Sequence, residues 1–348
     1  MKLATYRDGS RDGQLVVVSR DLTTAHYATH AAHTVRQALD DWNFISPQLQ
    51  DLSTALNQGK ARHAFPFDPT QCMAPLPRAT QCVRACARRG PDGPADPDAA
   101  GEPSATPAEA WSQLGGWALL GAREGVSVAH ENDLLEGGAG WAVFLSDVPM
   151  ACDPARALEG VRLLSIAHEW VLQRRADPAG QVPAFRRGLD ALQCQLGLAF
   201  SPVELTPDEL GPAWTGGRLH GVLEASHNGA PAGTWPSGEA MALHMGQLVA
   251  LLAANRPLSA GSVVFTGHLG RTGEPAPHPP SSHVCRGGHR RGGLDTSFGG
   301  ARVWRHRAGH LPDHGLSPCR RLAGVPDKAS GTQPVLRPGT PCRRNGNP

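Results

Sequence analysis

The chain alternates between stretches that can build a packed protein and stretches that cannot. Apolar spacing, helix caps and turns agree with one another in residues 1–77, 141–170 and 198–264, as they do in a sequence that specifies one fold. From Gly267 to Pro348 roughly a third of the residues are glycine or proline, and isoleucine, methionine and tyrosine are missing, which argues against a packed core. Chemistry that needs a rigid scaffold is therefore expected only in the coherent stretches.

The formal charge of the whole chain is only +2, but its basic residues gather at one end. The stretch after Gly267 holds a dozen arginines and one lysine against four carboxylates. No apolar run has signal-peptide length at the start or the roughly 20 residues that a membrane span needs, so we expect a cytoplasmic protein with no membrane partner. The eight cysteines follow no regular spacing, and we expect reduced thiols.

The N-terminal part of the chain has the signals of a small α+β domain. Asp-Gly pairs between Leu3–Tyr6 and Leu15–Ser19 predict a β-hairpin, since hairpin turns need positive φ angles. Thr34 is a candidate cap for one helix, and Ser46-Pro47 predicts the start of a second. We therefore expect a first domain over residues 1–77.

Residues 78–140 lack the apolar spacing of the first domain. Between Gln81 and Glu109 the chain is dense in alanine, glycine, proline, aspartate and arginine, with almost no large apolar residue beyond Val83. We expect this stretch to be disordered. The composition described above predicts a disordered tail over residues 267–348 as well.

Coherent signals return in residues 141–266, which we expect to form the second domain. Trp141–Leu145 predicts a buried strand, and Asp153-Pro154 predicts a capped helix. Thr206–Glu209 has the pattern of a capping box, and Asn228-Gly229 is a strong hairpin signal. Later segments predict a helix and a strand, over Met241–Leu252 and Ser262–Phe265 respectively.

The coherent stretches, taken in order, resemble the bacterial branch of the fumarylacetoacetate hydrolase family. The segments similar to its N-terminal domain are 1–5, 12–19, 64–69 and 74–77, and those similar to its catalytic domain are 146–150, 157–164, 199–203, 206–211 and 244–248. The coherent stretches that contain these segments cover about half the chain. The resemblance implies the α+β class, with a small α+β N-terminal domain followed by an incomplete mixed β-roll catalytic domain, usually in a homodimer.

The resemblance also implies a chemistry. Members of the family use Mg²⁺, Mn²⁺ or Ca²⁺, held by carboxylates, to bind a β-dicarbonyl substrate. A hard cation prefers oxygen ligands and stabilises the enolate that leaves when the bond breaks. The implied function is a metal-dependent hydrolase that cleaves a carbon–carbon bond in a diketo or oxo-acid, a small molecule of aromatic catabolism.

This chain departs from the family at the residues that hold the metal. The family's Glu-x-Glu pair aligns with Gly138 and Gly140, and a lysine expected near the substrate aligns with Gln195. Neither glycine offers a ligand, and glutamine cannot supply the positive charge of lysine. A further acidic element aligns with residues 168–170, which leaves Glu169 as the one candidate metal ligand.

No catalytic residue and no organic-cofactor site can be assigned from the sequence. The candidates for a catalytic or metal-binding role rest only on their position near the expected site in the sequence; they are His130, Asp133 and Glu136. A charged loop explains these residues equally well. We therefore expect little or no activity from the polypeptide as written. A shift of reading frame would explain the mismatched segments, since a GC-rich gene read out of frame yields arginine, glycine, proline and alanine; these segments are 79–140, 171–197 and 265–348.

Alternatives to an oxo-acid enzyme are a non-catalytic degenerate product or nucleic-acid binding by the tail. Residues 286–293 resemble an Arg-Gly-Gly segment, whose guanidinium groups contact phosphates and stack on bases. The signal is weak, because Phe298 and Trp304 stand alone where such segments interleave many aromatic residues.

Soft metal ligands and nucleophilic catalysis have little support. The histidines and cysteines with suggestive spacings are Cys82 with Cys86, His283, Cys285 and His289, and His306, His310 and His314. Glycine and proline between the last three argue against the helix that would align them. The absence of a Gly-x-Ser-x-Gly elbow and of a phosphate-binding glycine loop argues against ordinary esterases and nucleotide enzymes.

Overall fold

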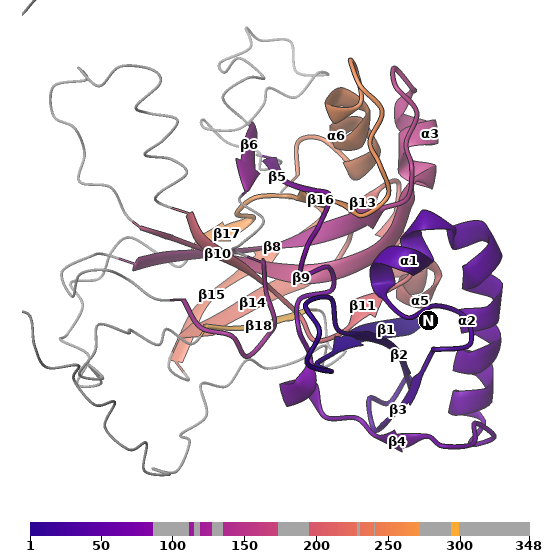
Figure 1. Cartoon of the computed structure of the whole chain (residues 1–348). Coiled ribbons are helices and arrows are strands. Elements are labelled where there is room, and N and C mark those ends of the chain that lie inside the picture. Colours follow the sequence, from indigo (N-terminus) through magenta and orange to yellow (C-terminus); the bar gives the residue numbers. More distant parts are fainter. Residues whose placement is uncertain are drawn as a thin grey trace, which may run out of the picture. The chain divides into compact units, whose positions relative to one another are not determined.

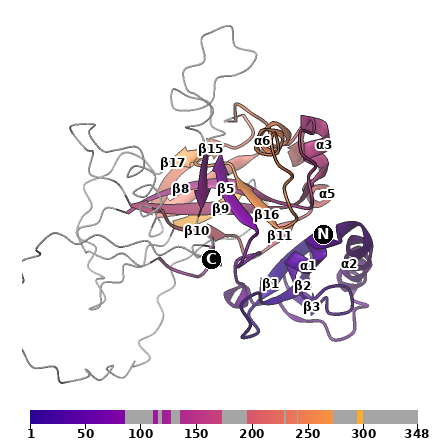
Figure 2. The same cartoon turned by 45° about the horizontal axis from the view of Figure 1, so that its top comes forward.

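The structure is a computed structural model with a mixed α+β fold, in which a small N-terminal domain adjoins a large mixed sheet (Figures 1 and 2). The fold class expected from the sequence is confirmed. The structure describes residues 1–85, 111–114, 119–126, 135–172, 195–227, 230–239, 241–271 and 294–298. No helix in these ranges is long and apolar enough to cross a membrane.

The N-terminal domain is a four-stranded antiparallel arrangement covered by two helices. Its elements are β1 Lys2–Tyr6, β2 Gln14–Val18, β3 Thr24–Tyr27, α1 Val35–Asp40, α2 Trp42–Asn57, β4 Phe65–Pro66 and the 3-10 helix η1 Pro69–Gln71. The predicted hairpin between β1 and β2 is confirmed. Its turn requires glycine at position 13, where φ is +64° and an added Cβ would lie 2.6 Å from the carbonyl oxygen of Tyr6.

The two helices begin differently from one another. Thr34 caps α1 as predicted, because its hydroxyl accepts a hydrogen bond of 3.1 Å from the backbone N–H of Gln37. The predicted start of the second helix at Ser46-Pro47 is wrong, since α2 begins at Trp42 and contains Pro47. The backbone N–H of Ile45 donates to the carbonyl oxygen of Asp41 over 3.0 Å, so the first helical turn is complete before Pro47. Proline has no backbone N–H, and at this position in the helix its absence removes one intrahelical hydrogen bond.

The strands that follow continue the sheet of the N-terminal domain. Their bounds are β5 Gln81–Ala85, β6 Trp111–Leu114, β7 Leu119–Leu120, β8 Leu135–Leu145, β9 Val161–Leu172, β10 Gln195–Phe200, β11 Glu204–Leu205, β16 Ser262–Phe265 and β17 Gly270–Arg271. Within the described residues the strand order is β4-β3-β2-β1-β11-β9-β8-β16-β5-β6. Three further strands join this sheet: β10 pairs with β9, β7 pairs with β10, and β17 pairs with β8. The β16–β5 and β10–β7 pairs are parallel and the others are antiparallel, which makes the sheet mixed.

Smaller elements complete the described structure. They are the helices α3 Pro154–Glu159, α5 Pro207–Leu210, η4 Gly211–Ala213 and α6 Met245–Leu252, and the strands β12 Trp214–Thr215, β13 Arg218–Leu219, β14 Val222–His227, β15 Ala230–Pro236 and β18 Leu294–Phe298. The predicted cap Asp153 accepts a 2.8 Å hydrogen bond from the N–H of Arg156. The predicted hairpin pairs β14 with β15, and its turn, Asn228-Gly229, lies outside the described residues.

The paired strands β8 and β9 separate two apolar cores. Side chains alternate along a strand, so Trp141, Val143 and Leu145 face one core, beneath α3 and α6, which pack against each other (Figure 1). Ala142 and Phe144 face the other core, which continues into the helices and hairpin of the N-terminal domain. The sheet is thus buried on both faces around its centre.

Several short segments of the stretches expected to be disordered are described as strands. In the stretch 78–140, β5 lies between β16 and β6, and its Cys82, Val83 and Ala85 are buried. The buried apolar run of this strand is short, so the composition of the whole stretch did not reveal it. β16 is paired along both of its edges, with β5 and with β8.

The expected tail also contains described strands, β17 and β18, which pair with β8 and β14 respectively. The rest of the two poorly matching stretches lies outside the described residues. The boundaries after residues 77, 140 and 266 stay predictions.

The capping box predicted at Thr206 is wrong, although α5 does begin with Pro207. The Thr206 hydroxyl is taken by the Met1 amine, which donates to it over 2.6 Å. Glu209 lies 3.3 Å from the same amine instead of reaching back to the helix N-terminus. These contacts hold the start of β1 beside β11.

Next to these contacts, β11 carries a fully buried carboxyl group. Glu204 is opposite Leu3 in the β1–β11 pair, is 0% exposed, and neither of its oxygens has a hydrogen-bond partner among the described residues. Burial raises its pKa well above the ordinary value of 4.5. The folded protein therefore holds Glu204 protonated at pH values where the unfolded chain has already lost that proton.

We predict that Glu204→Gln stabilises the protein increasingly as the pH rises above 4.5. The pKa of Glu204 is higher in the folded protein than in the unfolded chain. Its contribution to stability is fully present below the unfolded-state pKa and is lost as the pH rises toward the folded-state pKa. Between those two pKa values each pH unit costs the wild type about 1.4 kcal/mol. Urea unfolding between pH 5 and pH 8 measures the difference, with Glu124→Gln, at a partly exposed carboxylate paired with Arg7, as the control. A difference that stays constant over this range would contradict the prediction.

Candidate functional site

Glu169, the one metal ligand expected from the sequence, lies inside the sheet. It is in β9, opposite Gly138 of β8 on one side and Leu198 of β10 on the other. Backbone ladders on both sides fix its position, and the residue is 1% exposed. Its side chain points to the same face of the sheet as that of Ala167.

Two basic residues from distant parts of the chain meet the Glu169 carboxylate. His268, which follows β16, has its Nε2 atom 2.8 Å from Oε2 of Glu169, and Arg84 of β5 donates from Nη1 to the same oxygen over 3.2 Å. Burial acts to raise the pKa of Glu169, but the contact with His268 and the charge of Arg84 outweigh it, so the pKa is lowered. We call Arg84, Glu169 and His268 the charged cluster; its carboxylate is ionised in the folded protein.

The charged cluster is closed to solvent on one side and open on the other. The side chain of His268 is 7% exposed, whereas that of Arg84 is 38% exposed. The second carboxylate oxygen of Glu169, Oε1, is buried and has no hydrogen-bond partner among the described residues. The thiol of Cys82 nearby is no further ligand, because burial and then the charge of Glu169 raise its pKa and keep it protonated.

The two glycines that replace the expected carboxylates have no room for any side chain. A Cβ at Gly138 would lie 2.2 Å from Cγ of His268. A Cβ at Gly140 would lie 2.3 Å from the carbonyl oxygen of Gly267 and 2.5 Å from the hydroxyl oxygen of Thr266. The space that carboxylates would occupy is therefore filled by residues 266–268.

Hydrogen bonds hold this filling segment against β8. The N–H of Thr266 donates to the carbonyl of Trp141 over 3.0 Å, and the N–H of Leu269 donates to the carbonyl of Ala139 over 2.9 Å. The Thr266 hydroxyl accepts a bond from the N–H of Trp141, 3.2 Å away. We call residues 266–269 the strap; its Gly267 carbonyl lies over Gly140 and its His268 ring lies over Gly138.

The donor set does not fit a divalent cation. Mg²⁺, Mn²⁺ and Ca²⁺ need several oxygen ligands, and the described residues supply one carboxylate that is already paired with Arg84 and His268. No group of three or more His, Cys, Asp and Glu side chains that could hold a metal occurs in the part of the chain that the structure describes. A guanidinium beside the carboxylate also repels a second cation.

The other candidates from the sequence do not join the charged cluster. Gln195 begins β10 opposite Val171, and Glu136 in β8 is also opposite Val171. His168 neighbours Glu169 but faces the other side of the sheet, where its ring lies 4.4 Å, edge to face, from that of Trp170.

The remaining candidates lie outside the described residues: His130, Asp133, Cys86, His283, Cys285, His289, the Arg-Gly-Gly segment 286–293, His306, His310 and His314. The cysteines within the described residues, Cys72, Cys82 and Cys152, are free thiols.

Sequence reasoning missed Arg84 and His268, the two basic residues of the charged cluster. Arg84 lies in the stretch whose composition predicted disorder. The signal that could have found His268 is the glycine at position 138, since the loss of a side chain in a packed sheet requires another group to fill its place.

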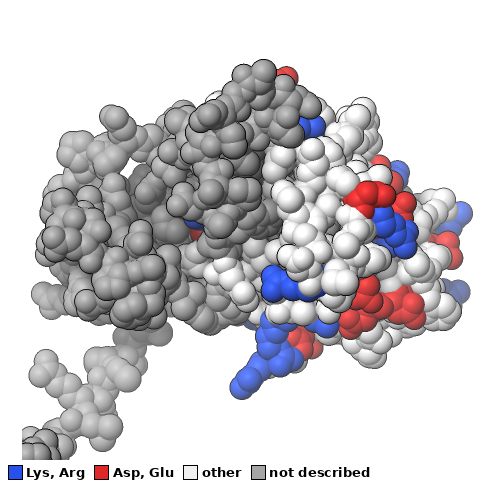
Figure 3. Space-filling model, turned by 90° about the horizontal axis from the view of Figure 1, so that it is seen from above, with Lys and Arg blue, Asp and Glu red and all other residues white. Residues whose placement is uncertain are grey.

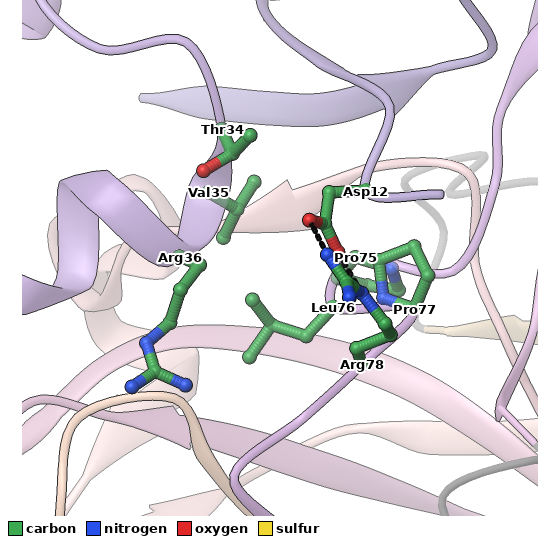
Figure 4. A pocket seen from close by; sticks show the side chains of 8 residues that line it. All are labelled: Asp12, Thr34, Val35, Arg36, Pro75, Leu76, Pro77 and Arg78. Carbon is green, nitrogen blue, oxygen red and sulfur yellow. Dashed lines mark hydrogen bonds and ion pairs between the residues drawn. The ribbon is translucent and has the colours of Figure 1, made fainter. Parts of the chain in front are cut away.

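A separate pocket of about 300 Å³ lies in the N-terminal domain (Figure 4). Of the residues that line it, Val35 and Leu76 are almost fully buried, and Arg36 and the Asp12–Arg78 ion pair lie on different sides. The lining residues are Asp12, Thr34, Val35, Arg36, Pro75, Leu76, Pro77 and Arg78.

Charged side chains of both signs are mixed on the surface of the described part. Figure 3 shows acidic and basic groups beside one another on the face that it presents. Ion pairs among the described residues include Arg156 with Glu159 and Arg36 with Asp40. On this face the described residues form no broad basic area of the kind that nucleic-acid binding requires.

Two family profiles match the chain. The profile "Fumarylacetoacetase N-terminal domain 2" matches residues 1–78, and the profile "Fumarylacetoacetate (FAA) hydrolase C-terminal" matches residues 104–289, which is more than half of the chain. The chain belongs to the fumarylacetoacetate hydrolase family. The resemblance stated from the sequence is thereby confirmed. No curated protein sequence matches the chain.

Solved structures share the fold of this fumarylacetoacetate hydrolase family member at low sequence identity. A maleylpyruvate hydrolase from Sphingobium sp. SYK-6, solved with manganese(II) and pyruvate, is 14% identical, with a TM-score of 0.58 over 86% of this chain and 95% of that one. A fumarylacetoacetate hydrolase from Exiguobacterium antarcticum is 17% identical, with a TM-score of 0.54 over 86% and 96%. A probable 2-hydroxyhepta-2,4-diene-1,7-dioate isomerase from Mycobacterium abscessus is 17% identical, with a TM-score of 0.56 over 86% and 94%.

We predict that Gly138 and His268 are energetically coupled. Gly138→Ala places a methyl group against the His268 ring, and we expect it to lower the free energy of unfolding by about 1–3 kcal/mol, as overpacking does. Adding His268→Gly removes the clash, so the double variant should lose less stability than the sum of the two single variants. Denaturant unfolding of the four proteins measures the coupling.

Gly125→Ala is the control for this cycle, because an added Cβ at that exposed glycine meets nothing within 4 Å. Strictly additive effects of Gly138→Ala and His268→Gly would show that the ring does not fill the space over Gly138.

Proposed function

We propose that this chain derives from metal-dependent hydrolases that cleave a carbon–carbon bond in a diketo or oxo-acid, and that the polypeptide as written has little or no such activity. One observation carries the proposal. The positions where the family holds its Glu-x-Glu pair are Gly138 and Gly140, and the strap fills the space above them. The loss of the carboxylates is therefore matched by a rearranged site with no room for them.

The charged cluster explains why the remaining carboxylate does not replace the lost ones. A divalent cation in this family would polarise the keto oxygens of the substrate and stabilise the enolate. Glu169 is the one described carboxylate at the site, and its charge is balanced by Arg84 and His268. In this chain Glu169 holds two basic side chains in place.

The relatives support the substrate class. One structure of similar fold carries manganese(II) and pyruvate, and the others named above are a fumarylacetoacetate hydrolase and a probable dioate isomerase. We propose a small oxo-acid as the ancestral substrate, with Mg²⁺, Mn²⁺ or Ca²⁺ as the ancestral cofactor and a homodimer as the assembly. The substrate, the cofactor and the assembly are inferred from membership of the family and not from the geometry of the charged cluster.

We expect the purified full-length protein to cleave fumarylacetoacetate or an acylpyruvate at least about 1000-fold more slowly than an active family member, because loss of a metal centre removes several kcal/mol of transition-state stabilisation. The assay follows loss of substrate absorbance with Mg²⁺, Mn²⁺ or Ca²⁺ added in turn. The fumarylacetoacetate hydrolase from Exiguobacterium antarcticum serves as the active reference.

Metal-dependent cleavage within about tenfold of the reference would overturn the claim of inactivity. Loss of that activity in Glu169→Ala, with unfolding unchanged, would then identify Glu169 as a metal ligand.

A reading-frame shift is the proposed origin of the altered site. We expect that another reading frame of the resequenced coding DNA restores a Glu-x-Glu strand and the strands that complete the catalytic domain. The frames to translate are those across residues 79–140, 171–197 and 265–348. One confirmed frame that gives this polypeptide would instead show a degenerate relative, and its function would then be sought in binding.

A further inference from the structure

Helix α6 begins at a histidine, which is not among the residues that usually occupy this capping position. Nδ1 of His244 accepts a hydrogen bond of 3.4 Å from the backbone N–H of Gln247, and the Gln247 side chain accepts one of 2.9 Å from the N–H of His244. The two bonds form a capping box in which an imidazole nitrogen replaces the usual hydroxyl oxygen. That nitrogen accepts only while it carries no proton, so the capping box requires neutral His244.

The surroundings of His244 also favour its neutral form. The residue is partly buried beside Gly217, where an added Cβ would lie 3.1 Å from Nδ1 of the ring. Burial and then the charge of Arg218 lower the pKa of His244 from its ordinary value of 6.5. The positive end of the helix macrodipole opposes a cation at this position as well.

No carboxylate offsets these effects within the described part of the chain. Arg218 is the one charged group there that acts on the pKa of His244, and its Nη2 donates to the carbonyl of Ala242 over 3.2 Å. On α3, which packs against α6, Arg156 and Glu159 pair with each other. Among the described residues an imidazolium at position 244 therefore gains no ionic partner.

The cap holds the start of α6 over the apolar core beneath α3 and α6 (Figure 1). Met241 and Met245, on either side of His244 in the sequence, are 0% exposed and belong to this core. The N–H of Met245 also donates to the carbonyl of Gly217 over 2.8 Å. α6 has only eight residues, and a helix this short depends on its ends and its packing because it is not stable by itself.

We propose that His244 is an acid-sensitive cap, which releases the first turn of α6 when its ring takes up a proton from solvent. The proton turns Nδ1 from an acceptor into a donor, so the hydrogen bond from the Gln247 N–H breaks. It also places a second positive charge near Arg218 and at the N-terminus of the helix. This response is separate from the charged cluster and does not depend on the hydrolase activity proposed above.

The response has a defined direction with pH. The pKa of His244 is lower in the folded protein than in the unfolded chain. Its contribution to stability is therefore fully present above the ordinary value of 6.5 and is lost as the pH falls toward the folded-state pKa. Glu204 acts in the opposite direction, since its contribution is lost as the pH rises. A loss of protection in acid thus reports on His244 and not on Glu204.

The test is hydrogen–deuterium exchange of the full-length protein, followed by mass spectrometry at about pH 7.5 and about pH 5, which bracket the titration of histidine. Rates are corrected for the effect of pH on the exchange of free peptides. We expect the amides at the start of α6 to exchange about fivefold faster in acid, which is the size of effect that loss of one N-cap gives. Helix α1 is the internal control, because its cap, the Thr34 hydroxyl, accepts from the N–H of Gln37 over 3.1 Å and does not titrate.

Variants at the cap should separate the proton from the hydrogen bond. His244→Ser supplies a capping oxygen that does not titrate, so the response of α6 to acid should disappear. His244→Ala supplies no cap, so α6 should exchange about fivefold faster than in the wild type already at neutral pH, and acid should add nothing. The control His30→Gln removes an exposed histidine of the N-terminal domain and should keep the wild-type response. Thermal unfolding at neutral pH checks that the variants are folded.

Three outcomes would each overturn the proposal. They are a wild-type α6 that exchanges equally fast at both pH values, an acceleration in acid that α1 shares in full, and an acceleration that persists in His244→Ser. The first two are read from the wild-type protein alone, so they decide the question even where a variant does not fold.

Discussion

The antiparallel pair of β8 and β9 is the constraint on which the rest of the structure depends. Its register runs from Leu135 opposite Leu172 to Leu145 opposite Val161, so both strands are fixed along their length. One face carries Trp141 and its neighbours beneath the two packed helices, and the other joins the core of the N-terminal domain. Because side chains alternate along each strand, this same register decides that Glu169 and Gly138 are neighbours on one face.

A glycine at position 138 has more than a local effect in such a sheet. Close packing leaves few voids in a protein interior, so another part of the chain fills the space over Gly138 and Gly140. The strap does this through backbone hydrogen bonds to β8, and it brings the His268 ring to Glu169. A carboxylate that would otherwise be buried beside one partly exposed arginine thereby gains a second basic partner. Gly138, Gly140 and the charged cluster therefore belong to one packing arrangement.

The sequence predicted those features that depend on neighbouring residues. The hairpin at Asp12-Gly13 and the caps at Thr34 and Asp153 follow from local backbone chemistry, and the structure contains all three. The cap at Thr206 failed because its hydroxyl bonds to Met1, a residue that is distant in the sequence. The charged cluster could not be predicted for the same reason, since Arg84, Glu169 and His268 meet only after β5, β9 and β16 have taken their places. The alignment found Glu169, but only the fold reveals what its charge is used for.

The parallel pairing of β16 with β5 has a consequence for the synthesis of the chain. Ser262 is paired with Gln81, and β16 also pairs along its other edge with β8, so a late segment fills the space between two early ones. Until residues 262–265 leave the ribosome, β5 and β8 each present an unpaired edge, and open edges of this kind associate with other chains. Closing so long a loop is also slow compared with forming a hairpin. Nascent chains of this protein are therefore exposed to aggregation during about half of their synthesis, between β5 and β16, which makes early binding by a chaperone an advantage.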